Sequence, residues 1–356
     1  DPYMIGCMHG RALAYYIMPL TLLVKCLSIF RKFPLDKIVI PEQIMQEMEG
    51  IADGYNSTNP TYSIDVSTVI KWHMLPMACS SIVTNTNGNL AFGRNMDWVP
   101  YGDLAKYSIL IRNEVTRTYS FCIPGMVGVV TGWNDAGLIL SMNVSPGTFC
   151  HGTPALFYNR LILESCRNTK EVVPFMESSK YKPFAMYHMT VVDDSDALAI
   201  AVNQGNNSVA CVGCMKRKPI DLTDEVLNEI DHSNNAKTDT KADNKTDTKT
   251  DNTDTIHQQS KSPHFIRKLT HNSHVATFNH RYENGEPTDS RFFSDERLSV
   301  KNKLIDTIPL KKLLSETPIN NWITCQTLLF MPSIKKVFIG FDNGFSGSSN
   351  LSEVSM

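Results

Sequence analysis

The pattern of apolar and polar positions predicts a chain in which strands outnumber helices. Helical spacing and helix-start signals mark the ranges 11–30, 41–55, 156–167 and 297–308. Runs rich in β-branched and apolar residues predict strands at 80–84, 90–97, 107–112, 137–144, 189–192 and 274–278, and a hairpin formed by 324–330 and 336–341. Because neighbouring strands are joined by short turns, the sequence predicts antiparallel sheets with helices packed outside, an α+β fold.

Two segments depart from this pattern. Residues 12–30 are mostly apolar, but Pro19 and Lys25 interrupt them, and a bilayer span needs roughly 20 predominantly apolar residues. This stretch also lacks the basic start of a signal peptide, so we expect a buried or half-buried helix, with a membrane-associated helix as the alternative. Residues 233–260 alternate Lys, Thr and Asp and contain no aromatic residue, which predicts a flexible insert within one domain.

Composition narrows the class of protein. The chain has 356 residues, of which 42% are hydrophobic, enough for one large domain or two compact ones. Lys and Arg number 34 against 36 Asp and Glu, a net charge of −2, so a nucleic-acid partner is not expected. The nine cysteines are too few for a disulfide scaffold.

A predicted hairpin brings reactive groups together. Asn87-Gly88 between two β-rich runs is a strong signal for a two-residue turn. A turn centred there pairs Cys79 with Met96 and Arg94 with Ser81, and it places Asp97 level with Ala78. The sequence therefore predicts a thiol, a guanidinium and a carboxylate at one end of a strand pair.

This combination suits nucleophilic chemistry, because a nearby positive charge stabilises a thiolate. Strict alternation sends Arg94 and Asp97 to opposite faces of the strand, so we expect a bulge or bend near Asn95 to bring them together. From spacing alone, the alternative is a buried structural Cys79 beside a structural Arg–Asp pair.

The same residues carry a family resemblance. Cys79-Ser-Ser and the block from Gly93 to Trp98 resemble the signature of N-terminal-nucleophile cysteine amidohydrolases. These include choloylglycine hydrolases, acid ceramidase and N-acylethanolamine amidase, and the isopenicillin N acyltransferase/carcinine hydrolase group. Further blocks follow in family order at Gly132–Leu138, Ser141–Asn143, Thr277–His280 and Asp289–Phe292. Two N-terminal segments, Gly6–Gly10 and Glu49–Gly54, resemble the propeptide of the acyltransferase group.

The resemblance implies an architecture and a maturation step. It implies a four-layer αββα sandwich of two antiparallel sheets. It also implies that the chain cuts itself between Ala78 and Cys79, with 1–78 as a largely helical propeptide and 79–356 as the catalytic part. The freed α-amine would then serve as a general base, since its reference pKa of roughly 7.7–8.0 suits proton exchange with a thiol.

The resemblance also implies roles for particular residues. Cys79 would be the nucleophile and, through its amine, the base, while Asp97 would orient that amine. Arg94 would favour the thiolate and help to hold the site. Asn279 would give a side-chain N–H, and Asn143 a backbone N–H, to the oxyanion.

The family's later arginine is expected at Arg291. Arg297 is an alternative, although its place in a predicted helix favours a simple surface residue.

The implied activity is cleavage of a linear, non-peptide N-acyl amide through an acyl-thioester. An acyltransferase that uses an amine or thiol acceptor is the alternative, and a non-catalytic binding relic is the second one. No cofactor or metal is expected, and the implied partners are a small-molecule amide and the two processed chains. Localisation stays open, with a lean towards an exported or lysosome-like compartment.

Overall fold

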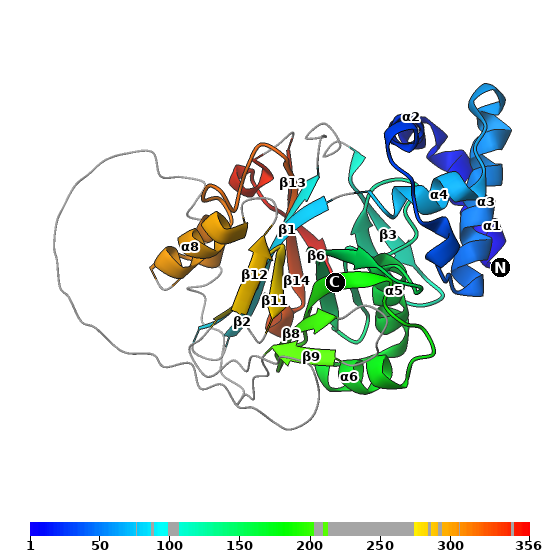
Figure 1. Ribbon diagram of the computed structural model, residues 1–356. Helices are drawn as coiled ribbons and strands as arrows, with labels where there is room; N and C mark the ends of the chain where they lie inside the picture. Colours follow the sequence, from blue (N-terminus) through cyan, green and yellow to red (C-terminus); the bar gives the residue numbers. More distant parts are fainter. Residues whose placement is uncertain are drawn as a thin grey trace, which may run out of the picture.

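Two antiparallel sheets form the centre of the protein (Figure 1). We describe a computed structural model over residues 1–75, 77–86, 89–98, 107–202, 209–212, 274–283, 286–290, 294–305, 307–342 and 345–356. The Asn87-Gly88 turn and the insert expected at 233–260 lie outside these described residues. The antiparallel arrangement predicted from the sequence is confirmed.

The first sheet has six strands in the order β10-β1-β2-β13-β14-β15. Their bounds are β1 Met77–Thr86, β2 Asn89–Trp98, β10 His274–Thr277, β13 Thr324–Met331, β14 Lys336–Phe341 and β15 Ser352–Ser355. The expected pairing of β1 with β2 is confirmed, since Cys79 lies opposite Met96 and Ser81 opposite Arg94. The β13–β14 hairpin is also confirmed, and Pro332–Ile334 forms its short 3-10 connection.

The second sheet has seven strands in sequence order, β3 to β9. They are β3 Ile109–Asn113, β4 Thr118–Cys122, β5 Thr131–Asn134, β6 Ile139–Phe149, β7 Ala185–Val192, β8 Ala197–Val202 and β9 Val209–Val212. A separate hairpin pairs β11 His280–Glu283 with β12 Glu286–Ser290. The second sheet supplies the surface that faces the strand of Cys79, because β6 lies against β1.

Three apolar layers separate the elements into an αββα sandwich. Phe92 and Phe330 of the first sheet pack against Trp133 of the second, and the Trp133 and Phe330 ring centroids are 5.7 Å apart. Helices α5 (Ala155–Ser165) and α6 (Thr169–Ser178) cover the outer face of the second sheet. Helices α8 (Ser294–Leu304) and α9 (Leu310–Leu313) cover the outer face of the first sheet. The four-layer fold expected from the resemblance is therefore present.

The N-terminal region is helical and packs beside the sandwich. It contains α1 (Pro2–Ala12), α2 (Ala14–Phe30), α3 (Glu42–Thr58) and α4 (Val66–Trp72). The single helix expected over 11–30 is wrong at its start, because the chain breaks at Leu13 and bends by 91° between α1 and α2. Gly10 and Gly54 allow the backbones of α1 and α3 to touch, since a Cβ at either position would collide with the other helix. The expected half-buried helix is confirmed in α2.

Two histidines attach these helices to a loop of the second sheet. His9 of α1 accepts a hydrogen bond at Nε2 from the Gly125 N–H at 2.9 Å. His73, just after α4, accepts one at Nε2 from the Val127 N–H at 2.9 Å, and its Nδ1 lies 2.9 Å from the Val69 carbonyl. Burial lowers the pKa of both imidazoles to about 4, although the hydrogen bond with the Val69 carbonyl acts in the opposite direction on His73. Both histidines are therefore neutral acceptors at neutral pH.

Acid should weaken this attachment. An unfolded histidine takes up a proton near pH 6.5, whereas the buried ones resist until about pH 4, so stability present above pH 6.5 is lost as the pH falls through that window. The lowered pKa of His73 alone should reduce the free energy of unfolding by about 3 kcal/mol across this pH range. Urea unfolding at stepped pH should show this fall, and a His9→Gln/His73→Gln double variant should flatten it, whereas His151→Gln, at an exposed position, should not. An unchanged slope in the double variant would contradict the assignment.

Candidate active site

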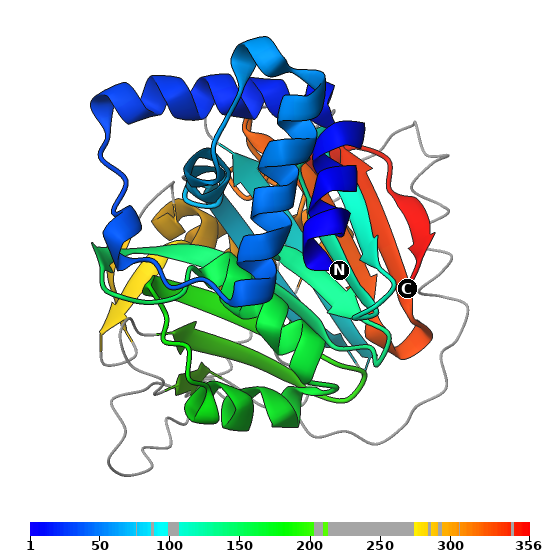
Figure 2. The same ribbon diagram turned by 90° about the vertical axis from the view of Figure 1, so that its right-hand side faces the viewer.

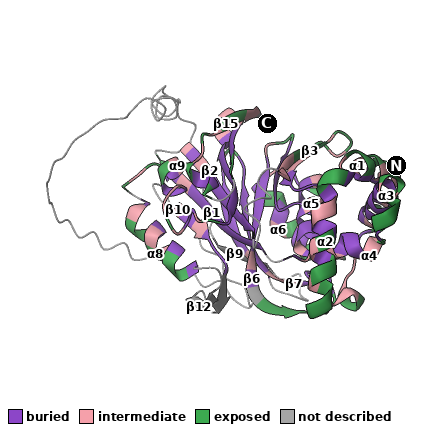
Figure 3. Ribbon diagram, turned by 90° about the horizontal axis from the view of Figure 1, so that it is seen from above, coloured by how far each residue is buried: buried purple, intermediate pink, exposed green. Residues whose placement is uncertain are grey.

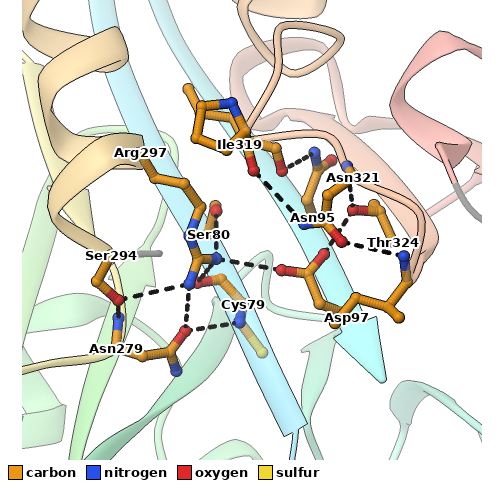
Figure 4. A network of polar contacts seen from close by, with 12 residues as sticks. Cys79, Ser80, Asn95, Asp97, Asn279, Ser294, Arg297, Ile319, Asn321 and Thr324 are labelled. Carbon is orange, nitrogen blue, oxygen red and sulfur yellow. Dashed lines mark hydrogen bonds and ion pairs between the residues drawn. The ribbon is translucent and has the colours of Figure 1, made fainter. Parts of the chain in front are cut away.

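Cys79 lies near the start of β1, the second strand of the first sheet, with polar side chains on both sides of its peptide group (Figure 4). Its side chain is fully buried. Its backbone N–H donates to Asn279 Oδ1 at 2.9 Å. Its carbonyl oxygen accepts hydrogen bonds from Asn143 Nδ2 at 2.9 Å and from Arg297 Nη1 at 3.0 Å. Strands and a helix that are far apart in the sequence therefore meet at one residue.

Arg94 and Asp97 occupy opposite faces of the sheet. The β1–β2 register runs without interruption from Met77–Trp98 to Thr86–Asn89, so the bulge expected near Asn95 is wrong. The irregularity lies instead in β13, between Thr324 and Gln326. Asp97 has no need to reach Arg94, because another arginine meets it on its own face.

Arg94 lies on the same face as the Cys79 side chain, between the two sheets. Its Nη1 donates to Ser81 Oγ at 2.9 Å and to Asn143 Oδ1 at 2.8 Å. Its Nη2 donates to the Met142 carbonyl at 2.6 Å, and its Nε to Thr131 Oγ1 at 3.2 Å. The buried guanidinium therefore connects β1 and β2 to β5 and β6 of the second sheet.

Arg297 lies on the opposite face and is the site residue that sequence reasoning undervalued. Its interpretation as a helix-surface residue is wrong, because its side chain is 0% exposed. Its Nη1 lies 3.1 Å from Asp97 Oδ2 in an ion pair and 3.0 Å from Ser80 Oγ. Its Nη2 donates to Asn279 Oδ1 at 2.9 Å. Arg297 thus bridges the carboxylate and the amide that flank Cys79.

Three hydroxyl groups complete the site, and sequence reasoning assigned none of them a role. Thr324 Oγ1 donates to the second carboxylate oxygen of Asp97 at 2.6 Å. Ser294 Oγ accepts the Asn279 backbone N–H at 3.0 Å, and Ser81 Oγ donates to Asn143 Oδ1 at 2.8 Å. The hairpin register could have found Ser81. Thr324 and Ser294 reach the site only because β13 pairs with β2 and α8 packs on the first sheet.

The two asparagines are at the site, with contacts that differ from those expected. Asn143 meets Cys79 through its side chain, and its Nδ2 also donates to the Thr277 carbonyl at 2.8 Å. Asn279 presents its carbonyl oxygen to the Cys79 nitrogen, while its Nδ2 donates to Val144 O at 2.7 Å. With the Ala78–Cys79 bond intact, the expected side-chain N–H of Asn279 is thus engaged elsewhere, and its oxyanion role stays a prediction. Arg291 lies outside the described residues.

The environment of the thiol favours its protonated form in the continuous chain. Burial raises the pKa of the Cys79 thiol, and the Asp97 charge raises it further, while Arg94 and Arg297 act in the opposite direction. The influence of Arg94 thus has the expected sign, but it is smaller than that of burial. A second buried thiol, Cys325, lies in the same apolar cluster as Cys79. Among the described residues, no cluster of three or more His, Cys, Asp or Glu side chains is arranged to hold a metal ion.

Residues 83–288 match the family model of acyl-coenzyme A:6-aminopenicillanic acid acyl-transferase. The matched segment contains Arg94, Asp97, Asn143 and Asn279, and Cys79 lies just before it. A search of curated proteins finds no significant match.

Three solved structures are matched over most of this chain at low identity. The Caenorhabditis elegans N-acylethanolamine-hydrolyzing acid amidase ortholog is 15% identical, with 72% of this chain and 93% of that chain covered and a TM-score of 0.43. A mutant form of the conjugated bile acid hydrolase from Clostridium perfringens is 11% identical, with 78% and 92% covered and a TM-score of 0.39. Penicillin V acylase from Agrobacterium tumefaciens is 14% identical, with 78% and 86% covered and a TM-score of 0.36.

Proposed function

Since the chain belongs to the acyl-coenzyme A:6-aminopenicillanic acid acyl-transferase family, within the N-terminal-nucleophile superfamily, we propose that it is a self-processing cysteine amidohydrolase. Its reaction would be cleavage of a linear N-acyl amide through an acyl-thioester on Cys79. The observation that carries the proposal is the buried set of side chains on the Cys79 peptide group. Asn279 contacts its N–H, and Asn143 and Arg297 contact its carbonyl.

Maturation would begin with the thiol of the uncut chain. The Cys79 sulfur attacks the Ala78 carbonyl carbon, the amide nitrogen leaves with a proton, and water then hydrolyses the thioester. The products are a carboxylate on Ala78 and a free α-amine on Cys79, which separate a propeptide, 1–78, from a catalytic part, 79–356. The raised pKa of the buried thiol and the amide state of its nitrogen both suit an inactive precursor.

The freed amine would then act as the base. It takes the thiol proton, the sulfur attacks the substrate carbonyl, and the proton passes to the leaving amine. Asn279 Oδ1 already accepts the hydrogen of this nitrogen, and Arg297 joins Asn279 to Asp97. We therefore assign Asn279 and Asp97 to orientation of the amine, and Arg94 to fixing the strand that carries the thiol.

Acyl transfer is the second candidate, because the family model that matches the chain describes an acyl-transferase. In that case an amine or thiol acceptor would resolve the thioester in place of water. A binding protein without catalysis is the remaining alternative, which the buried charged set at Cys79 does not favour.

Product analysis tests these alternatives. Purified protein would be incubated with N-acylethanolamines, ceramide, conjugated bile salts, acylated amines and penicillins, with and without an added amine or thiol, and followed by mass spectrometry. We expect free acid at a rate that acceptors leave unchanged. A product that joins the acyl group to the acceptor would favour transferase over hydrolase. No turnover of any substrate by processed protein would contradict an enzymatic role.

A further inference from the structure

Helix α2 carries an apolar stripe on its outer side. Tyr15, Leu22, Ile29 and Phe30 are 72%, 47%, 75% and 87% exposed, and Cys26 between them is exposed as well. We call these five residues the α2 face. At 3.6 residues per turn, positions 15, 22, 26 and 29 fall within about 60° of arc, so they form one continuous stripe.

The opposite side of α2 is firmly packed. Ile17, Leu20 and Val24 are at most 1% exposed and belong to the apolar cluster that also holds Trp72 of α4. Figure 2 shows α2 in blue, running nearly at right angles to α1 along the outside of the N-terminal helices, and Figure 3 shows exposed positions along these helices in green. The α2 face therefore belongs to a helix whose position is already fixed.

The charges of α2 and of the residues that flank it in the sequence have one sign. Arg11, Lys25, Arg31 and Lys32 are exposed, and no Asp or Glu occurs from residue 2 to residue 35, although the whole chain carries −2. Arg31 and Lys32 directly follow the end of the stripe, where long cationic side chains can lie along an apolar surface while their charged ends reach outward. This pattern fits a partner that has an apolar interior and an anionic surface.

We propose that the α2 face binds the surface of a membrane that contains anionic lipid, with the stripe inserted among the acyl chains and the cations at the head groups. No single helix of the described residues is long and apolar enough to span a bilayer, and the α1–α2 pair, which has the length and composition of a span, is bent by 91°. Because Ile17, Leu20 and Val24 on the other side of α2 are buried, only the α2 face is available to lipid. A second copy of the chain fits less well, because a two-fold contact would place the same cations against each other. The proposal is independent of the reaction at Cys79.

Vesicle binding by the full chain tests the proposal. In a sedimentation assay, the protein should bind phosphatidylcholine vesicles that contain phosphatidylserine about tenfold or more tightly than vesicles of pure phosphatidylcholine. Salt at about 1 M should remove most of that preference, because the screening length falls to about 3 Å. Wild-type protein that stays in the supernatant with both vesicles would overturn the proposal.

Matched variants locate the surface. Leu22→Gln/Ile29→Gln should weaken binding by about 100-fold, because it removes two inserted apolar side chains. Arg31→Gln/Lys32→Gln should remove most of the preference for phosphatidylserine. Val115→Gln/Trp322→Gln removes two exposed apolar side chains elsewhere and should bind as wild type does. Equal binding by the Leu22/Ile29 variant, or a concentration-dependent dimer that this variant abolishes, would overturn the proposal.

Discussion

Replacement of Cys79 with alanine should leave the chain in one piece and lower turnover by on the order of 10⁴-fold or more. The variant removes the attacking atom of both proposed steps, self-cleavage and substrate cleavage. It changes little in packing, because alanine keeps the hydrogen bonds to the backbone N–H and carbonyl of residue 79 and loses only the contact of the thiol with Arg94. Gel electrophoresis after purification measures processing, and release of free acid measures turnover.

Cys325→Ala is the matched control. Cys325 is a second buried thiol in the same apolar cluster, and its sulfur contacts the Met96 carbonyl at 3.4 Å. Burial strongly raises its pKa, with a further contribution from Asp97, so it is a poor nucleophile. The Cys325→Ala variant should process and turn over as wild type does. If the Cys325→Ala variant lost activity while the Cys79→Ala variant kept it, the nucleophile would be Cys325, and the assignment to Cys79 would be contradicted.

Arg297→Met should be the second most damaging change. It leaves Asp97 as a buried, unpaired carboxylate, which typically costs about 3–5 kcal/mol of stability. It also removes a donor from the Cys79 carbonyl and the bridge to Asn279, so we expect processing to stop. Arg297→Lys keeps the charge but not the two-nitrogen fork, and should restore stability in part without restoring normal processing. Chemical denaturation and the uncut fraction measure the two effects separately.

Arg160→Met separates loss of stability from loss of function. Arg160 is a largely buried arginine that pairs with Glu47 at 2.7 Å and Glu164 at 2.8 Å, and both of these carboxylates lie on helices outside the site. Its replacement should lower stability while the folded fraction still processes its chain. Equal processing defects in the Arg160→Met and Arg297→Met variants would reduce Arg297 to a structural residue.

The hairpin at the site could be predicted because its signals are local. Asn87-Gly88 and the flanking β-rich runs predict a turn, and a turn there predicts every pair from Cys79–Met96 to Ser81–Arg94 that the strands form. Eight of the fifteen described strands could be predicted for the same reason, since period-two patterns do not depend on distant contacts. The sequence pattern predicts no strand for the others, which are β4, β5, β8, β9, β11, β12 and β15. The break at Leu13 was missed because apolar residues continue through it and no Gly or Pro marks it.

The Asp97–Arg297 pair could not be predicted because it is a contact of the folded chain. Arg297 occurs in a helix with Asp295, Glu296, Lys301 and Lys303, and this composition is typical of a solvent-exposed helix. Only the packing of α8 on the first sheet turns this arginine inward. A bulge at Asn95 would pair Asp97 with the nearest arginine in the sequence, Arg94, whereas the fold pairs Asp97 with the distant Arg297.

The intact mass of the purified wild-type chain tests the central claim most directly. We predict two polypeptides, residues 1–78 ending in the Ala78 carboxylate and residues 79–356 beginning with the free amine of Cys79. The Cys79→Ala chain, purified in parallel, should give one mass for all 356 residues. A wild-type chain that keeps the Ala78–Cys79 bond and still cleaves amides at full rate would contradict the account, because its nucleophile would have no α-amine.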